Sequence, residues 1–294
     1  PQRKMALGIS MVIVLTTLGI CARLQVSYWN NSTSLFTHAI KVTQDNYIAH
    51  CNLGVAYLNL GHYQDAIESY KQTIRIKPDL AKAHYNLGVT YYKLGRYQDA
   101  IEAYKQAVRI KPDFAEAHSG LGNAYKDLDR YQETIESYKQ AIRIKPDLAE
   151  AHCNLGDVYG KLGHHQDAVE SYKQAIRIKP DLAEAHYNLG VTYGKLDRNK
   201  DAIESYKQAI RIKPDYAESH NNLGNTYGKL GRYQEAIESL KQAIRIKPDY
   251  ANAHNNLGFA YLMTGDKRSA LEEYKILKTL DTELSNELFN LINK

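Results

Sequence analysis

The chain of 294 residues has little of several residue types that often define a protein class. It contains only three cysteines, one tryptophan, four phenylalanines and seven prolines. Three cysteines form no disulfide framework, so they say nothing about the redox compartment. Tyrosine, in contrast, occurs 24 times. So uneven a composition predicts a chain built from copies of one unit.

A strong excess of one charge is also missing from most of the chain. The net charge of +5 comes largely from residues 1–43, which carry four basic side chains and no acidic one. Residues 44–281 carry 33 basic and 31 acidic side chains. This near balance lacks the electrostatic footprint of a nucleic-acid-binding protein. We therefore expect no nucleic-acid partner.

Long apolar runs are absent except near the start. Residues 5–22 contain no charge, and as a helix they would extend about 27 Å, close to the thickness of a bilayer core. A buried core helix usually has a polar face, and no good signal-peptide cleavage site lies near Ala22. We predict that residues 1–26 form a hydrophobic helix that spans a membrane through residues 5–22.

The basic residues around this run predict its orientation. Arg3 and Lys4 precede it, and only Arg23 follows closely. Because basic residues favour the cytoplasmic side of a span, we expect the rest of the chain to be extracytoplasmic, in a periplasm or a lumen.

Proline recurs with a fixed spacing of 34 residues. The six internal prolines are Pro78, Pro112, Pro146, Pro180, Pro214 and Pro248. Gln44 holds the place one period before the first of them. The spacing defines seven units, which are residues 44–77, 78–111, 112–145, 146–179, 180–213, 214–247 and 248–281.

Each unit predicts two helices joined by a tight turn. In residues 78–111, apolar residues recur at helical spacing on both sides of Gly95, which suits the left-handed residue that ends a helix. The second helix closes with Arg109 and Lys111, cations at the negative end of its dipole. Pro112 then stops it.

The stretch from Asn86 to Pro112, NLGVTYYKLGRYQDAIEAYKQAVRIKP, resembles the tetratricopeptide repeat (TPR). The resemblance covers residues 44–281 and implies an all-α solenoid, a right-handed superhelix of helix–turn–helix units. By this resemblance, Gly88 packs two helices closely and Tyr104 fills the core. Asp129 and Asp197 depart from the pattern, since they replace the glycine of the turn.

Both ends of the repeat array have a predicted cap. Residues 27–43 align with the second helix of a repeat and form a half repeat. Residues 282–294 predict a capping helix, with one apolar face that comprises Leu284, Leu288, Leu291 and Ile292. Such caps keep the ends of a solenoid soluble.

The acidic residues and histidines of each repeat predict structural roles. Asp181 and Glu184 have the spacing of a reciprocal helix cap, which three other repeats share. The histidine column is His50, His84, His118, His152, His186, His220 and His254. Histidines one repeat apart do not converge on one ion, so we expect locally hydrogen-bonded rings and no metal site. Nor does any column supply a nucleophile with its base, so we expect no enzyme and no cofactor.

An asparagine column gives the candidate site. It resembles the asparagine ladder of O-linked N-acetylglucosamine transferase, which implies amides that hold a peptide backbone on the concave face. A carboxamide suits this role because it both donates and accepts hydrogen bonds. The alternative is that these amides bond between neighbouring repeats. The candidate residues are Asn52, Asn86, Asn154, Asn188, Asn222 and Asn256, with Tyr85, Tyr187, Lys93, Lys161, Lys195 and Lys229 beside them.

Three functions fit these features. The first is a membrane-anchored, non-catalytic scaffold that binds an extended protein segment in its groove. The second follows from residues 28–54, which resemble the join between the last span and the repeats of transmembrane TPR-containing O-mannosyltransferase-like proteins and bacterial membrane glycosyltransferases. That resemblance implies a catalytic part upstream of this chain. The third is self-association of like units into a filament.

Overall fold

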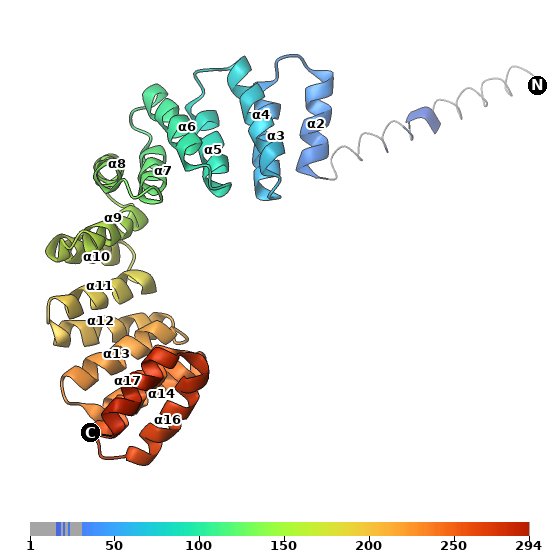
Figure 1. The fold of residues 1–294 in the computed structure, drawn as a ribbon. Helices are drawn as coiled ribbons and strands as arrows, with labels where there is room; N and C mark the ends of the chain where they lie inside the picture. The colour runs from blue at the N-terminus through green and yellow to red at the C-terminus, as the bar shows by residue number, and fades with distance from the viewer. Residues whose placement is uncertain (1–15, 19, 21–22, 24–30, 294) are drawn as a thin grey trace, which may run out of the picture. The chain divides into compact units, whose positions relative to one another are not determined.

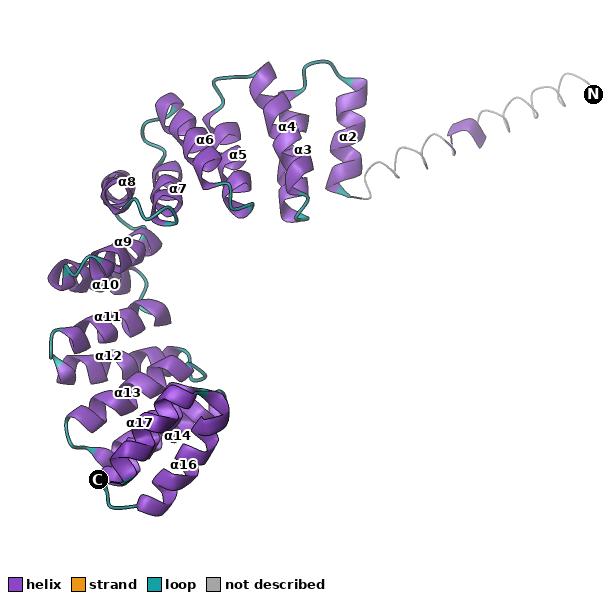
Figure 2. Ribbon diagram, viewed as in Figure 1, coloured by secondary structure: helices purple, strands orange, loops and turns teal. Residues whose placement is uncertain are grey.

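A computed structural model describes residues 16–18, 20, 23 and 31–293, and this part of the chain is helical and without strands (Figure 2). The all-α prediction is therefore confirmed. The predicted membrane span, residues 5–22, falls almost wholly outside the described residues. Among those described, no helix combines the length and the apolar character needed to cross a bilayer.

Sixteen helices are described, numbered α2 to α17, and Figure 1 labels those for which there is room. The described residues up to Ile144 form one compact unit, and those from Lys145 onward form another. The first unit holds α2 (Ser32–Val42), α3 (Tyr47–Asn59), α4 (Tyr63–Ile76), α5 (Ala81–Lys93), α6 (Tyr97–Ile110), α7 (Ala115–Lys126) and α8 (Tyr131–Ile144). The second holds α9 (Ala149–Lys161), α10 (His165–Ile178), α11 (Ala183–Lys195), α12 (Asn199–Ile212), α13 (Ala217–Lys229), α14 (Tyr233–Ile246), α15 (Ala251–Met263), α16 (Lys267–Leu280) and α17 (Thr282–Ile292).

The helices from α3 to α16 form pairs, each pair made of a first and a second helix that pack together. Corresponding helices begin 34 residues apart, as in α5 at Ala81 and α7 at Ala115. Within each unit, a second helix also packs on the first helix of the next pair. A helix therefore buries one face against the other helix of its pair, and within each unit it buries another face against the neighbouring pair, as in repeat proteins generally.

A glycine and a tyrosine set the close approach within a pair. A Cβ atom on Gly88 would lie 2.7 Å from the Tyr104 ring, and one on Gly190 would lie 2.6 Å from the Tyr206 ring. Only a residue without a side chain leaves room for these buried rings. The tyrosine column thus forms much of the core in both units.

The turns inside the pairs follow the sequence prediction. Gly95 has a φ of 72°, and four other turn glycines also lie in the left-handed region. Asp129 and Asp197 take the same conformation, each with a φ of 55°. Aspartate tolerates this region better than most residues, so the turn survives both replacements.

The predicted helix cap at Asp181 is wrong. The N-cap of α11 is Leu182, which makes no side-chain capping bond. The backbone N–H of Leu182 donates to the carbonyl of Lys179 at 3.3 Å, so a turn separates the two helices. This turn places Asp181 one residue before the cap, where its carboxylate accepts no N–H of the first turn.

The last helix covers the end of the repeat array through two residues. Leu288 is fully buried and Ile292 is 6% exposed, whereas Leu284 is half-buried. Leu291 is 41% exposed, so the predicted four-residue face is wrong at this position. The α17 helix packs on both α15 and α16, and its buried side is formed by Leu288 and Ile292, not by Leu291.

Candidate functional site: the first-helix face

The asparagine column lies along the first helices of the repeats. We call the surface formed by these helices the first-helix face. Its members are half-buried, apart from Asn86, which is 9% exposed. In each unit, successive first helices contact one another directly. The asparagines therefore lie where one repeat meets the next.

In the second unit, three of the asparagines bond to the preceding repeat. Asn188 Nδ2 donates to Asp157 Oδ1 at 3.0 Å, and the Tyr172 hydroxyl donates to the same oxygen at 2.8 Å. Burial and the Asp157 carboxylate raise the pKa of Tyr172, so its hydroxyl remains a donor. The bond from Asn188 thus connects two repeats through one carboxylate.

A longer chain of bonds follows farther along the same face. Asn256 Nδ2 donates to Asn221 Oδ1 at 3.0 Å, and Asn221 Nδ2 donates to Asn222 Oδ1 at 3.1 Å. Asn222 Nδ2 then donates to the Tyr187 hydroxyl at 3.2 Å. Asn222 also makes a side-chain hydrogen bond with Tyr206. An amide nitrogen has two hydrogens, so Asn188 and Asn256 each keep a second N–H after the bond to the preceding repeat. Bonding between repeats and bonding to a ligand are therefore compatible.

The first unit bonds its amides differently. The side chains of Asn52 and Asn86 make no hydrogen bond within the described residues. Asn123 stands in the same column as Asp157, and its Oδ1 accepts the Tyr138 hydroxyl at 2.5 Å. Two pairs earlier, Val55 stands in this column, and the buried hydroxyl of Tyr70 has no partner. Asn123 in this column thus satisfies Tyr138, whereas Val55 offers no acceptor to Tyr70.

Tyr85 and Tyr187, the two candidate tyrosines, are half-buried in small aromatic groups. The Tyr187 ring lies 4.9 Å from that of Tyr216 and 6.1 Å from that of Tyr206. Tyr85 lies 5.0 Å from Phe114 in the corresponding arrangement. Burial raises the pKa of both candidate tyrosines. Each contributes to packing and presents only part of its ring on the first-helix face.

The four candidate lysines are exposed, and each lies in the last turn of a first helix. A cation at this position also stabilises the helix dipole. Lys93, Lys161, Lys195 and Lys229 therefore have a structural reason to be present whatever the face binds.

The histidine column bonds locally, as predicted, in six of its seven members. His186 Nε2 lies 3.0 Å from the carbonyl oxygen of Pro180, and the other five have the same contact with their own repeat proline. His50, where Gln44 replaces the proline, has no such contact. In the part of the chain that the structure describes, no three His, Cys, Asp or Glu side chains gather as a metal site would require.

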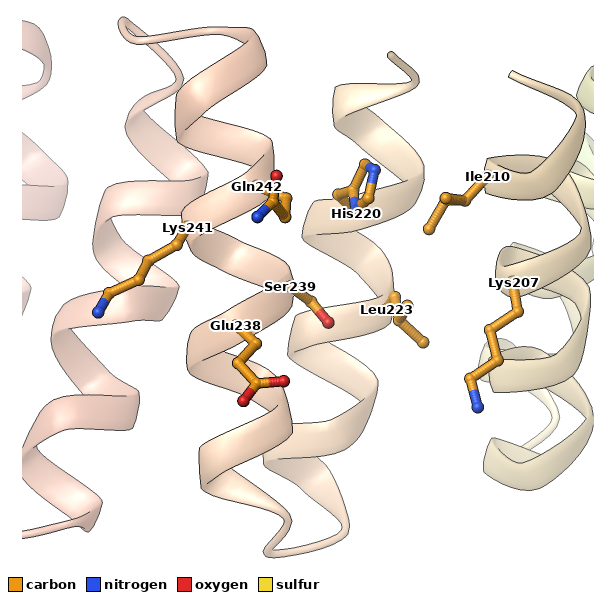
Figure 3. A pocket seen from close by; sticks show the side chains of 8 residues that line it. All are labelled: Lys207, Ile210, His220, Leu223, Glu238, Ser239, Lys241 and Gln242. Atoms are coloured by element: carbon orange, nitrogen blue, oxygen red, sulfur yellow. The ribbon is translucent and has the colours of Figure 1, made fainter. Parts of the chain in front are cut away.

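A groove of about 480 Å³ lies among α12, α13 and α14 (Figure 3). His220, Leu223, Glu238 and Gln242 are among the residues around it. Another groove, of about 360 Å³, is lined by the residues five repeats earlier in these four columns, His50, Leu53, Glu68 and Gln72. Because the groove recurs with the repeat, it is a product of repeat stacking and defines no special site.

A hollow of about 230 Å³ opens on the first-helix face among α13, α14 and α15. Asn225, Gly228, Leu240 and Phe259 line it. Neither Leu240 nor Gly228 was predicted from the sequence as part of a site. The available signal was the column itself, since Leu240 stands where five preceding repeats have tyrosine.

These helix pairs, their glycine–tyrosine contacts and their 34-residue spacing define a helical-repeat solenoid of the TPR type. Residues 81–285 match the family model of the cilia and flagella-associated protein 70 C-terminal domain, and the chain belongs to this TPR family. Two further TPR models match residues 57–95 and 35–68. No curated protein matches the chain. None of these findings supports the resemblance to membrane glycosyltransferases.

Solved structures share the fold. MamA is 31% identical with a TM-score of 0.53, and the match covers 56% of this chain and 97% of MamA. YrrB, described as a TPR protein with an unusual peptide-binding site, is 23% identical with a TM-score of 0.54, over 63% of this chain and 95% of YrrB. PilW, a type IV pilus biogenesis factor, is 21% identical with a TM-score of 0.61, over 72% and 98%. The likeness to YrrB and PilW shows the fold alone.

Proposed function

We propose that the chain is a non-catalytic scaffold that binds an extended protein segment along its first-helix face. The observation that carries the proposal is the row of amides on this face, which recurs at 34-residue spacing in six of the seven repeats and is interrupted at Gly120. An extended backbone presents N–H and C=O groups at regular intervals, and a carboxamide can pair with either group. The candidate lysines would add contacts to acidic side chains of the segment.

The bonds between repeats support this proposal because they orient the amides. Asn188 and Asn222 are each held by a neighbouring side chain, at 3.0 Å and 3.2 Å. A group that is already fixed loses less conformational entropy when a ligand binds. The face would therefore offer an ordered row of polar groups to a partner.

The test is binding of the whole chain to an array of peptides, compared with the triple variant Asn154→Ala/Asn188→Ala/Asn222→Ala. We expect the variant to lose at least about tenfold in affinity, because each lost ligand hydrogen bond contributes about 0.5–1.5 kcal/mol. Circular dichroism and thermal unfolding would establish that the variant still folds.

A matched control removes the same chemistry from the second helices. The variant Gln174→Ala/Gln208→Ala/Gln242→Ala also deletes three carboxamides one repeat apart, and all three lie outside the first-helix face. It should bind peptides as the parent does. If the control loses binding, or the asparagine variant retains it while folded, the segment does not bind to the asparagine row.

We further propose that residues 5–22 anchor the scaffold in a membrane with the repeats extracytoplasmic. The support is the uncharged run and the basic residues before it. The expected result is that the expressed chain sediments with membranes and resists extraction at alkaline pH, while a Leu18→Arg/Ile20→Arg variant is released. If the variant sediments with membranes as the parent does, residues 5–22 are not the anchor.

A further inference from the structure

The hollow among α13, α14 and α15 differs from other first-helix positions in one respect. At the corresponding place in five earlier repeats, the second helix contributes a tyrosine: Tyr70, Tyr104, Tyr138, Tyr172 and Tyr206. Here it contributes Leu240, which is 1% exposed and packs under Gly224. A leucine fills the space nearest that glycine, but it does not reach as far as the distal ring atoms and the hydroxyl of a tyrosine.

The missing part of the phenol can be located from the neighbouring repeats. A Cβ atom built on Gly160 or on Gly194 would lie 4.0 Å from the hydroxyl of the local tyrosine. Gly228 is the next member of this column, and a Cβ atom there would meet nothing within 4 Å. Gly228 lines the 230 Å³ hollow. The empty space is therefore the place where a tyrosine hydroxyl would be.

The hydrogen-bond partner for such a hydroxyl is also present. In two repeats with a polar residue in the adjacent column, that residue accepts the tyrosine hydroxyl: Asn123 from Tyr138 at 2.5 Å and Asp157 from Tyr172 at 2.8 Å. Asn225 is the member of this column at the hollow. Its side chain is exposed and makes no hydrogen bond within the described residues. Asn225 thus has the position of a phenol acceptor without a phenol.

We propose that this hollow binds the side chain of a tyrosine from the protein segment held on the first-helix face, with its hydroxyl donating to Asn225. The inference rests on the proposed function, since it names one residue of that segment. Phe259, which is 42% exposed at the rim, supplies an aromatic surface for the incoming ring. The volume suffices, because an apolar cavity of about 150 Å³ already accepts benzene.

The pocket can be tested without knowing the segment, with p-cresol as the side-chain analogue of tyrosine. Saturation-transfer NMR on the whole chain should show p-cresol bound to the parent. In Leu240→Tyr, the chain's own phenol fills the hollow, and we expect at least a tenfold loss. This variant restores the residue of five other repeats, so it should fold. Gln242→Ala, on the same helix but outside the hollow, should bind p-cresol as the parent does.

The acceptor is tested by Asn225→Val, which copies the valine found at position 191. The parent should bind p-cresol about three- to tenfold more tightly than the variant does, because one hydrogen bond is lost. Toluene, which has no hydroxyl, should bind the parent and the variant equally. Equal p-cresol binding to Leu240→Tyr and the parent, both folded, would overturn the pocket. Equal p-cresol binding to Asn225→Val would overturn the assigned acceptor.

The peptide array separates this inference from the proposed function. Peptides retained by the parent should be enriched in tyrosine, and Leu240→Tyr should lose that preference. If peptides depend on the asparagine row but show no tyrosine preference, this inference fails and the proposed function stands. If p-cresol binds but no peptide of any sequence is retained, the hollow is not used by a segment, and the inference fails together with the proposed function.

Discussion

Each core tyrosine lies beside a column whose residue differs from repeat to repeat. Tyr138 and Tyr172 donate to Asn123 and Asp157, while Tyr70 lies opposite Val55 and has no partner for its buried hydroxyl. An unpaired buried hydroxyl opposes folding, whereas a paired one is roughly neutral or favourable. The same side chain should therefore have opposite energetic effects in two repeats.

This difference gives the first prediction. Tyr70→Phe removes an unsatisfied hydroxyl and should leave the free energy of unfolding unchanged or raise it by up to about 1 kcal/mol. Tyr138→Phe removes the hydroxyl that donates to Asn123 Oδ1 and should lower the free energy of unfolding by about 1 kcal/mol. Chemical denaturation of both variants would measure the two values. A loss at Tyr70 equal to that at Tyr138 would show that both hydroxyls are satisfied in solution.

At the scale of the helix, two glycines in α11 have contrasting surroundings. A Cβ atom on Gly190 would lie 2.6 Å from the Tyr206 ring, while one on Gly194 would lie 4.0 Å from the hydroxyl of the same tyrosine. The Tyr206 side chain is 3% exposed and is part of the packed core. Only the first glycine is therefore required for packing.

The two glycines are a matched pair for substitution by alanine. Gly194→Ala should stabilise the chain by about 1 kcal/mol, which is the cost of glycine inside a helix. Gly190→Ala makes the same gain, but overpacking that costs about 1–3 kcal/mol should outweigh it. Thermal unfolding of the two variants should shift in opposite directions. Stabilisation by both would mean that the α11–α12 pair can open to admit a methyl group.

The α15–α16 pair contains an ion pair that its counterparts lack. His254 Nδ1 lies 2.5 Å from Glu273 Oε2, and its Nε2 lies 2.8 Å from the carbonyl of Pro248. Both neighbours of the ring are acceptors, which favours the doubly protonated form. Burial opposes that charge, but the bonds to Glu273 and Pro248 outweigh it, and the pKa of His254 is raised.

The raised pKa predicts how stability changes with pH. The folded protein binds this proton more tightly than the unfolded chain, so the stabilisation is complete below about pH 6.5. It is lost as the pH rises through the higher folded pKa. Glu273→Gln should lower the free energy of unfolding by about 1–3 kcal/mol at pH 6 and by less at pH 9. Denaturation of the parent and the variant at both pH values would check this, and a loss independent of pH would contradict it.

At the scale of the whole molecule, most of the architecture could be predicted from the sequence because it repeats. Proline spacing gave the period, and local residue preferences gave the left-handed turns and the bonds between histidine and proline. The cap at Asp181 was wrong, since a one-residue difference in turn geometry moved the carboxylate away from the helix.

The site was less predictable because it depends on contacts between repeats. Whether Asn188 bonds to Asp157 depends on which side chains two different helices present to each other. The residue type at one position of each repeat does not show which side chains of neighbouring repeats bond to each other. The hollow beside Leu240 was missed for the same reason. The hollow arises because Leu240 replaces the tyrosine of the preceding repeats beside Gly228 and Asn225, which lie on another helix.

Repetition also leaves an end that must be covered, and the structure shows how α17 covers it. In the other pairs, the first-helix glycine faces a residue of its own second helix, but a Cβ atom on Gly258 would lie 2.5 Å from Leu288 of α17. Tyr274, the residue expected there, lies instead beside Phe289, with 5.1 Å between the rings. Leu288 therefore holds the place of a core tyrosine and ties α17 to the last repeat.

The final prediction concerns this covered end. Leu288→Ala should lower the free energy of unfolding by about 2–5 kcal/mol, since it empties a fully buried site. Loosening α17 would also expose the apolar ends of α15 and α16, so we expect the variant to self-associate as its concentration rises. Sedimentation velocity at two concentrations would detect this. Leu291→Ala, in the same helix but 41% exposed, should change stability by less than about 0.5 kcal/mol and leave the association state unchanged. If the two variants have the same stability and association state, Leu288 is not the residue that holds α17 on the last repeat. Other contacts of α17 must then cover the end of the array.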